Sequence, residues 1–246
     1  MPKIPEIYTF LKQLAPLELA EEWDNPGLLI DCGGDVTSVL CALDITADVV
    51  REAETLGCQL IVSHHPVIFT PLKSLRRGDV PFLMVKKNIS GICMHTNLDA
   101  AEGGVNDLLA RLFGLTEIEK FEGLGRIGKL KEPVSAAELA EKCRAAFKAP
   151  VKYVEAKRPV RTLAIVGGAG DMAAEAAAAG ADCLLTGEGK HHAAIDAAQL
   201  GIGLIAAGHF ATEFPIIPYL ADRLAKAFSG LRVVISRKGT DPYTYL

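Results

Sequence analysis

The sequence has little of what marks secreted, membrane-spanning or nucleic-acid-binding chains. No two cysteines show C-x-x-C spacing, no basic run is longer than Arg76-Arg77 or Lys86-Lys87, and the first residues contain no apolar signal core. The formal net charge is -4. Sequence-independent binding to nucleic acid needs lysine and arginine side chains concentrated on one face of the protein. The composition therefore argues against a nucleic-acid partner.

Long uninterrupted apolar runs are also missing. The most apolar stretch, residues 163–185, is broken by Asp171, Glu175 and Asp182, which is typical of strand, helix and strand rather than of a membrane span. The six cysteines are dispersed, and most lie in apolar runs. Buried free thiols in a reducing compartment explain them better than disulfides, so we expect a cytoplasmic protein.

Half of the residues are hydrophobic, and strands alternate with helices along the chain. In the first half we expect helices near 7–14, 47–56, 81–87 and 105–113, and strands near 28–30, 39–43, 59–62 and 91–94. In the second half we expect helices near 135, 172–179, 193–200 and 217–227, and strands near 151–154, 162–166, 182–185, 203–206 and 233–236. This alternation predicts an α/β fold with sheets flanked by helices.

The order of elements is alike in the two halves, which predicts an internal repeat of two similar α/β lobes, residues 1–125 and 126–246, forming one compact unit. The join would lie near residues 123–133. The alternative is a coincidence between generic α/β units. Ligands of open α/β sheets gather at the carboxyl ends of strands. Both halves place histidines and carboxylates directly after strands, so we expect a metal site between the lobes.

The six histidines lie at four places in the sequence: His64-His65, His95, His191-His192 and His209. His64 and His65 follow a buried strand, and adjacent residues of an extended chain point in opposite directions. Such a pair suits two metal ions better than one, although two loop histidines would look the same. Asp99 could bind or bridge ions, whereas His95 could bind an ion or only orient a neighbour. His209 and Glu213 would share one helical face, unless they are a loop histidine and a capping glutamate.

Two further segments have open interpretations. Lys190, His191 and His192 could bind an anionic substrate or move protons, or they could simply be polar residues at a helix start. The glycine-rich turn at 167–170 could hold a phosphate on its amides, although a tight turn alone explains it better. The segment from Trp23 to Gly27 contains the only tryptophan and is typical of a turn.

The chain resembles the NIF three-like family over essentially its whole length. Some members carry an inserted domain, for which the short join leaves no room. The resemblance rests on five ordered motifs: Glu22-Trp23-Asp24-Asn25-Pro26-Gly27-Leu28, Ser63-His64-His65-Pro66, His95-Thr96-Asn97-Leu98-Asp99, Thr186-Gly187-Glu188-Gly189-Lys190-His191-His192 and Gly208-His209-Phe210-Ala211-Thr212-Glu213. Pro26 stands where the family commonly has a valine-like residue.

The resemblance implies a dinuclear metal centre and a toroidal homohexamer built as a trimer of dimers. The two divalent ions per subunit could be zinc, iron, manganese, nickel or magnesium, and the histidines favour a transition metal. By motif, the implied metal ligands are His64, His65, Asp99, His209 and Glu213.

Bacterial members are often labelled GTP cyclohydrolase I type 2 homologues. The label implies hydrolytic opening of the purine imidazole ring by metal-bound hydroxide, with loss of formate. His95, Lys190, His191 and His192 are the candidates for proton transfer or for binding of the anionic substrate. The alternatives are a metal-dependent phosphoesterase and a non-catalytic role in metal binding, metal trafficking or scaffolding.

Overall fold

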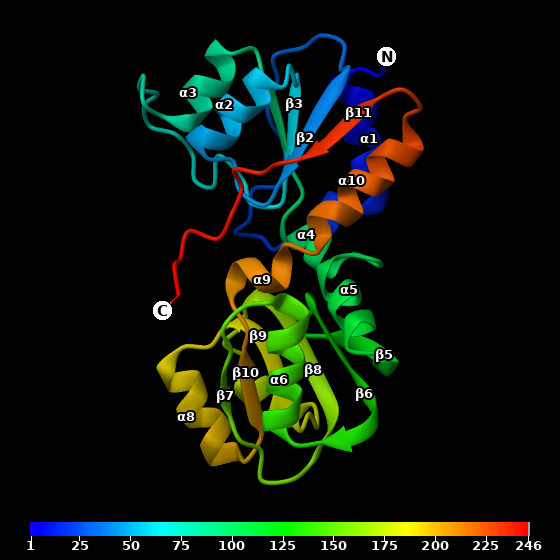
Figure 1. Ribbon diagram of the computed structural model, residues 1–246, viewed down its shortest axis with the longest axis vertical. Helices are drawn as coiled ribbons and strands as arrows, with labels where there is room; N and C mark the ends of the chain where they lie inside the picture. Colours follow the sequence, from blue (N-terminus) through cyan, green and yellow to red (C-terminus); the bar gives the residue numbers. More distant parts are fainter. Residues whose placement is uncertain (246) are drawn as a thin grey trace. The chain divides into compact units, whose positions relative to one another are not determined.

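A computed structural model describes residues 1–245, which divide into two compact units (Figure 1). Unit 1 comprises Met1–Glu102 and Ile216–Thr240. Unit 2 comprises Gly103–Pro215 and the segment that begins at Asp241. Each unit is built on one sheet with helices packed on it, as the alternation of strands and helices predicts.

Unit 1 contains a five-stranded sheet in the order β1-β4-β3-β2-β11. Its strands are β1 (Gly27–Ile30), β2 (Ser38–Ala42), β3 (Leu60–Ser63), β4 (Ser90–Cys93) and β11 (Arg232–Ile235). Its helices are α1 (Ile4–Leu14), the 3-10 turn η1 (Leu17–Leu19), α2 (Ala47–Thr55), α3 (Val80–Lys86), α4 (Thr96–Ala100) and α10 (Ile216–Ala227). All neighbouring strands are parallel except β1, which is antiparallel to β4.

The sheet of unit 1 is covered on both faces. Leu40 and Ile61 belong to a core that also contains Val49 of α2 and Met84 of α3. The alternate residues of these strands point to the opposite face, where α10 packs against β2 and β11. β2, β3 and β4 are therefore buried along their whole length, as parallel strands covered by helices must be.

Unit 2 contains a six-stranded sheet in the order β5-β6-β8-β9-β10-β7. Its strands are β5 (Thr116–Phe121), β6 (Gly125–Val134), β7 (Lys152–Val154), β8 (Val160–Ala169), β9 (Cys183–Glu188) and β10 (Gly203–Ala206). Its helices are α5 (Val105–Leu112), α6 (Ala136–Phe147), α7 (Ala173–Ala178), α8 (His191–Leu200) and α9 (His209–Glu213). β8, β9 and β10 are parallel, and the outer pairings are antiparallel.

Small residues let helices approach both faces of this sheet closely. Ala176 of α7 and Ala197 of α8 share a core with Leu184 and Leu204. On the other face, a Cβ on Gly203 would lie 3.3 Å from Ala136 of α6, so that helix rests directly on β10. α6 begins with the capping box that the sequence predicts at Ser135 and Glu138, because each donates a backbone N–H to the side chain of the other.

The predicted repeat is present, but the last helix and strand of each half belong to the unit that contains the other half. Both halves run through a helix, an edge strand and three parallel strands that alternate with helices, and then reach a short helix, α4 or α9. After α4, α5 and β5 join unit 2, whereas after α9, α10 and β11 join unit 1. The boundary expected at residues 125 and 126 falls inside unit 2, and residues 123–133 form most of β6 rather than a join. β6 pairs with β5 and β8 inside the sheet of unit 2.

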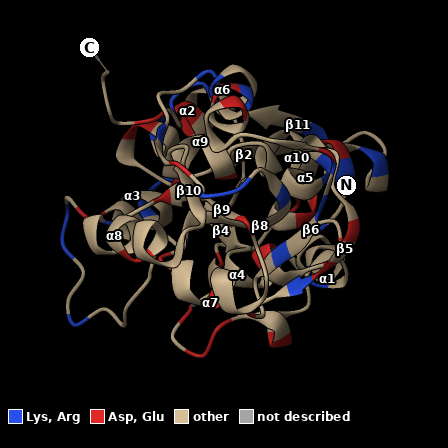
Figure 2. Ribbon diagram, turned by 90° about the horizontal axis from the view of Figure 1, so that it is seen from below, with Lys and Arg blue, Asp and Glu red and all other residues tan. Residues whose placement is uncertain are grey.

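Other bulk properties follow the composition. All six cysteines are free thiols, five of them buried. Within residues 1–245, no helix has both the length and the apolar character that a membrane span requires. Acidic and basic segments are interspersed in the view of Figure 2.

Candidate metal centre

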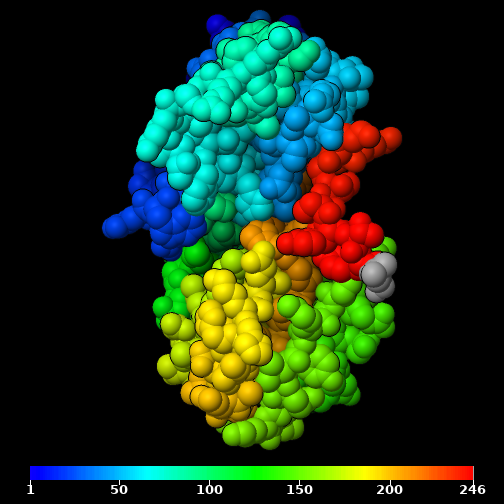
Figure 3. All heavy atoms as spheres, turned by 90° about the vertical axis from the view of Figure 1, so that its left-hand side faces the viewer, coloured from blue at the N-terminus to red at the C-terminus, as the bar shows by residue number. Residues whose placement is uncertain are grey.

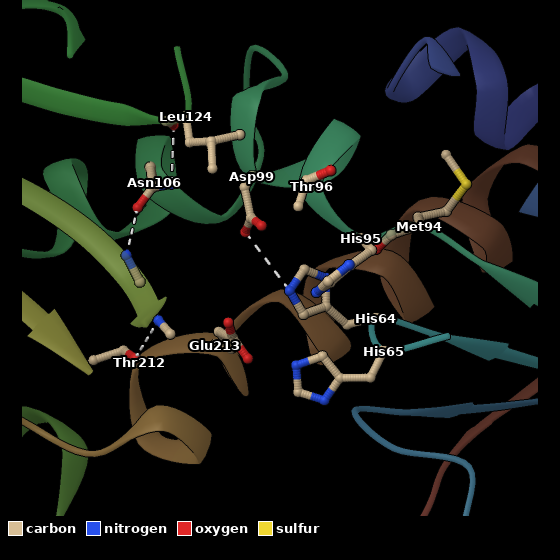
Figure 4. A network of polar contacts seen from close by, with 12 residues as sticks. His64, His65, Met94, His95, Thr96, Asp99, Asn106, Leu124, Thr212 and Glu213 are labelled. Atoms are coloured by element: carbon tan, nitrogen blue, oxygen red, sulfur yellow. Dashed lines mark hydrogen bonds and ion pairs between the residues drawn. The ribbon is translucent and has the colours of Figure 1, made fainter. Parts of the chain in front are cut away.

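Three histidines of unit 1 follow neighbouring parallel strands. His64 and His65 come directly after β3, and His95 lies between β4 and α4. Because β3 and β4 are paired in parallel, their carboxyl ends meet at one edge of the sheet. The ring centroids of His64 and His65 lie 5.1 Å apart, and the His95 ring is 5.2 Å and 5.5 Å from them. One ring nitrogen from each lies within 4.8 Å of the other two (Figure 4).

Fixed acceptors hold the other ring nitrogen of two of these histidines. His64 Nδ1 lies 2.8 Å from the carbonyl oxygen of Met94, and His65 Nδ1 lies 2.7 Å from Asp44 Oδ1. A carbonyl can only accept a hydrogen bond, so neutral His64 carries its proton on Nδ1, and the carboxylate favours the same tautomer in His65. The lone pair of each ring is then on Nε2, the arrangement that a metal ligand needs.

His95 is oriented in the same way by a buried carboxylate. Its Nδ1 lies 2.7 Å from Oδ1 of Asp24, whose side chain has no exposed surface. Asp24 Oδ2 accepts hydrogen bonds from the backbone N–H and the hydroxyl of Thr96 at 3.0 Å and 2.5 Å. Burial opposes ionisation of Asp24, but the hydrogen bonds from His95 and Thr96 and the charge interaction with His95 outweigh it. The pKa of Asp24 therefore falls from 3.8 to about 2.

Asp99 adds a carboxylate to the histidines. It lies in α4, the short helix after β4, and is buried. Its Oδ1 is 3.6 Å from His64 Nε2, the atom that carries the lone pair (Figure 4). Asn97 stabilises the turn between His95 and Asp99, because its side chain accepts from the His95 backbone N–H at 2.9 Å and donates to Ala15 at 2.8 Å. Unit 1 therefore presents imidazole nitrogens and a carboxylate oxygen close together.

Unit 2 contains the second predicted pair, His209 and Glu213, as the first and last residues of α9. The expected helical spacing is present, and His209 Nε2 lies 3.0 Å from Glu213 Oε2. His209 Nδ1 lies 2.9 Å from Oε1 of Glu188, the last residue of β9. Each end of this imidazole thus faces a carboxylate, and the side chain of Glu213 is 5% exposed.

The glycine-rich turn after β8 has a role in this second pair. The amides of Gly167 and Gly168 donate to Asn106 Oδ1 at 2.8 Å and to Thr212 Oγ1 at 3.1 Å (Figure 4). A Cβ on Gly168, whose φ is +65°, would collide with Glu213 Oε1. These two amides are therefore used inside the unit, and the turn makes room for the Glu213 carboxylate rather than for a phosphate.

Comparison with known proteins agrees with the motifs. The family model of Duf34/NIF3 (NGG1p interacting factor 3) matches residues 2–242. The chain belongs to this family.

Relatives in the Duf34/NIF3 family span nearly the same length. A Streptomyces coelicolor protein named GTP cyclohydrolase 1 type 2 homolog is 34% identical, and the match covers 99% of this chain and 94% of that protein. A Helicobacter pylori protein named GTP cyclohydrolase 1 type 2 is 33% identical over 87% of this chain and 88% of its own. The crystal structure of a Staphylococcus aureus hypothetical protein superposes with a TM-score of 0.89 at 30% identity, covering 99% of both chains.

The remaining predicted residues of this family member lie at the start of α8. Lys190 is the N-cap, and its Nζ lies 2.7 Å from Asp171 Oδ2. Burial of Asp171 opposes its ionisation, but hydrogen bonds from Lys190 lower its pKa. His191 and His192 follow and are exposed. The ion pair directs the charge of Lys190 toward Asp171, so an anionic ligand would have to compete with that carboxylate.

Sequence reasoning assigned no orienting role to three residues: Asp24 and Glu188, which occur in two of the motifs, and Asp44, which occurs in none. Asp44 lies two residues after the end of β2 and Glu188 ends β9, so the rule that ligands gather at strand ends could have identified both. Asp24 lies in a loop 71 positions before His95, and no spacing links the two.

Proposed function

We propose that this protein is a metal-dependent hydrolase that acts on a purine nucleotide. Two divalent ions per subunit would be held by His64, His65, Asp99, His209 and Glu213. The observation that carries the proposal is the orientation of the histidines in unit 1. Their Nδ1 atoms face fixed acceptors, and a ring nitrogen of each converges with the others within 4.8 Å.

The chemistry of the donor set fits a divalent metal. Imidazole nitrogen and carboxylate oxygen together suit zinc, iron, manganese or nickel, whereas magnesium prefers oxygen alone. The hydrogen bonds to Nδ1 fix the tautomer in advance, so the proton does not have to move before an ion binds to Nε2. Such ions, when bound, would polarise the substrate and make a water molecule more acidic.

The protein would supply proton transfer and anion binding. Asp24 holds the His95 proton on Nδ1, so Nε2 is the atom that would exchange a proton with the substrate. Lys190, His191 and His192 would bind anionic groups or assist in proton transfer. The names of the relatives, GTP cyclohydrolase 1 type 2 and its homolog, support GTP as the substrate. The reaction that we propose is hydrolytic opening of its imidazole ring with release of formate.

The test is metal analysis of the purified protein, followed by assays of the metal-reconstituted protein. We expect bound transition metal and release of formate from GTP. His65→Ala and Glu213→Gln should each lower the metal content and abolish turnover. Glu175→Gln on α7, which removes the charge of an exposed glutamate, is the matched control and should change neither.

Other outcomes separate the alternatives. Hydrolysis of p-nitrophenyl phosphate without formate release would support a phosphoesterase. Tight metal binding without turnover of either substrate would instead support a role in metal trafficking or scaffolding. The homohexamer implied by the family resemblance stays a prediction, and sedimentation of the purified protein tests it.

A further inference from the structure

Two aromatic side chains of unit 1 meet at the surface. Trp23 is 58% exposed and Phe69 is 47% exposed. They come from different loops, and their ring centroids lie 5.9 Å apart at an interplanar angle of 44°. The loop that contains Phe69, drawn in cyan in Figure 3, lies on the outside of unit 1. Burying either side chain would remove a large apolar area from water.

Hydrogen bonds hold the two loops together. Asn25 Nδ2 donates to the carbonyl oxygen of Ile68 at 2.6 Å, and this bond joins the residue two after Trp23 to the residue before Phe69. The Asn25 backbone N–H donates to Asp24 Oδ1 at 2.7 Å. Because the Asp24 side chain is fully buried, the backbone that carries Trp23 is anchored next to an exposed indole.

Both rings also meet His95. The His95 centroid lies 6.2 Å from that of Trp23 and 6.3 Å from that of Phe69, with interplanar angles of 78° and 76°. The same imidazole lies beside His64 and His65. The aromatic pair therefore borders the candidate metal ligands of unit 1, with His95 between them.

From this arrangement we propose that Trp23 and Phe69 bind the flat heteroaromatic ring of the substrate. The inference rests on the proposed function and names the part of the substrate that these residues recognise. Large apolar rings held at the surface are typical of a binding site, and a flat ring can stack on an aromatic face whatever its substituents. The imidazole edge of His95 adds a polar group next to that face.

Two exposed side chains favour a small flat ligand over a second copy of the chain. A stable protein interface buries about 800 Å² on each partner, far more than two side chains supply. The proximity of His95 gives the ligand a hydrogen-bonding group as well as an apolar surface. Bound here, the ring would lie next to the histidines that are proposed to hold metal.

Trp23 is the only tryptophan, so its fluorescence reports this site directly. The probe is guanosine, which has the ring but no phosphate, with ribose as the ring-free control. We expect saturable quenching by guanosine and none by ribose. Phe69→Leu should weaken guanosine binding by about 5- to 150-fold, the range for loss of one aromatic stack. Trp23→Leu, measured by equilibrium dialysis, should weaken it similarly.

Tyr153→Leu is the matched control, because Tyr153 is an aromatic residue of unit 2 whose side chain is 49% exposed. The Tyr153→Leu variant should bind guanosine as tightly as the original protein does. Metal content is measured in every sample and should not change. Absence of quenching in metal-replete protein, or equal quenching by ribose, would overturn the inference. The inference would also be overturned if the original protein did not bind guanosine and Trp23→Leu caused an oligomer to dissociate. Guanosine binding without metal or turnover would refute only the proposed function.

Discussion

Asp24 offers a quantitative test of how the site is held. Replacing it with asparagine removes the charge and leaves only one good acceptor for the three hydrogen bonds from His95 and Thr96. A buried carboxyl whose pKa falls from 3.8 to about 2 on folding contributes about 2.4 kcal/mol at neutral pH. This stability is fully present above about pH 4 and is lost as the pH falls through about 2. Asp24→Asn should therefore cost about 2 kcal/mol at pH 7.

The assay is urea denaturation followed by circular dichroism at several pH values between 7 and 2.5. The difference in unfolding free energy between the original protein and Asp24→Asn should shrink as the pH approaches 2.5. Asp48→Asn is the control, because its side chain is 71% exposed and pairs only with Arg51 in the next turn of the helix, and we expect less than about 1 kcal/mol. A difference for Asp24→Asn that is the same at pH 7 and pH 2.5 would refute the reasoning.

Three further predictions concern both units. Gly168→Ala should displace the Glu213 side chain and lower the metal content of the protein. Gly180 is also at positive φ but has open space around it, so Gly180→Ala should lower the unfolding free energy by only about 1 kcal/mol and leave metal binding unchanged. Metal analysis and thermal melts distinguish the two variants. Asp107→Asn should destabilise unit 2 by about 3 kcal/mol in urea denaturation, because it removes the carboxylate that forms an ion pair with the buried Arg126 guanidinium, and a cost below 1 kcal/mol would contradict this. A thiol reagent should modify at most one of the six cysteines in the native protein and all six in urea, because five are buried; rapid reaction of a second native thiol would count against the structure.

Most of the candidate site could be predicted because its signal is local. Apolar strands followed by histidines place His64, His65 and His95 at one sheet edge, and the spacing of His209 and Glu213 gives one face of α9. The partners that fix the imidazoles could not all be found in this way. Asp24 acts through a contact between residues 71 positions apart, and such a contact depends on the folded loop.

The fold shows the same division between local and long-range information. The apolar pattern identified the parallel strands as continuous buried runs and their helices as periodic apolar faces, because both signals lie within a few positions. It did not identify β5 and β6, since β5 is exposed at five of its six positions and has no apolar pattern. Pairing with β8 holds β6 in the sheet, and that pairing brings residues from distant parts of the chain together.

The exchange of chain ends between the halves has a consequence for how the protein folds. β11 pairs with β2 through residues such as Arg232 and Ser38, which are 194 positions apart. Unit 1 can complete its sheet only after residues 103–215, the main part of unit 2, have been synthesised, and until then the β2 edge has no neighbouring strand. Contacts of such long sequence separation slow folding. Until β11 arrives, that edge is a template on which another nascent chain could add a strand, and therefore a point where aggregation can start.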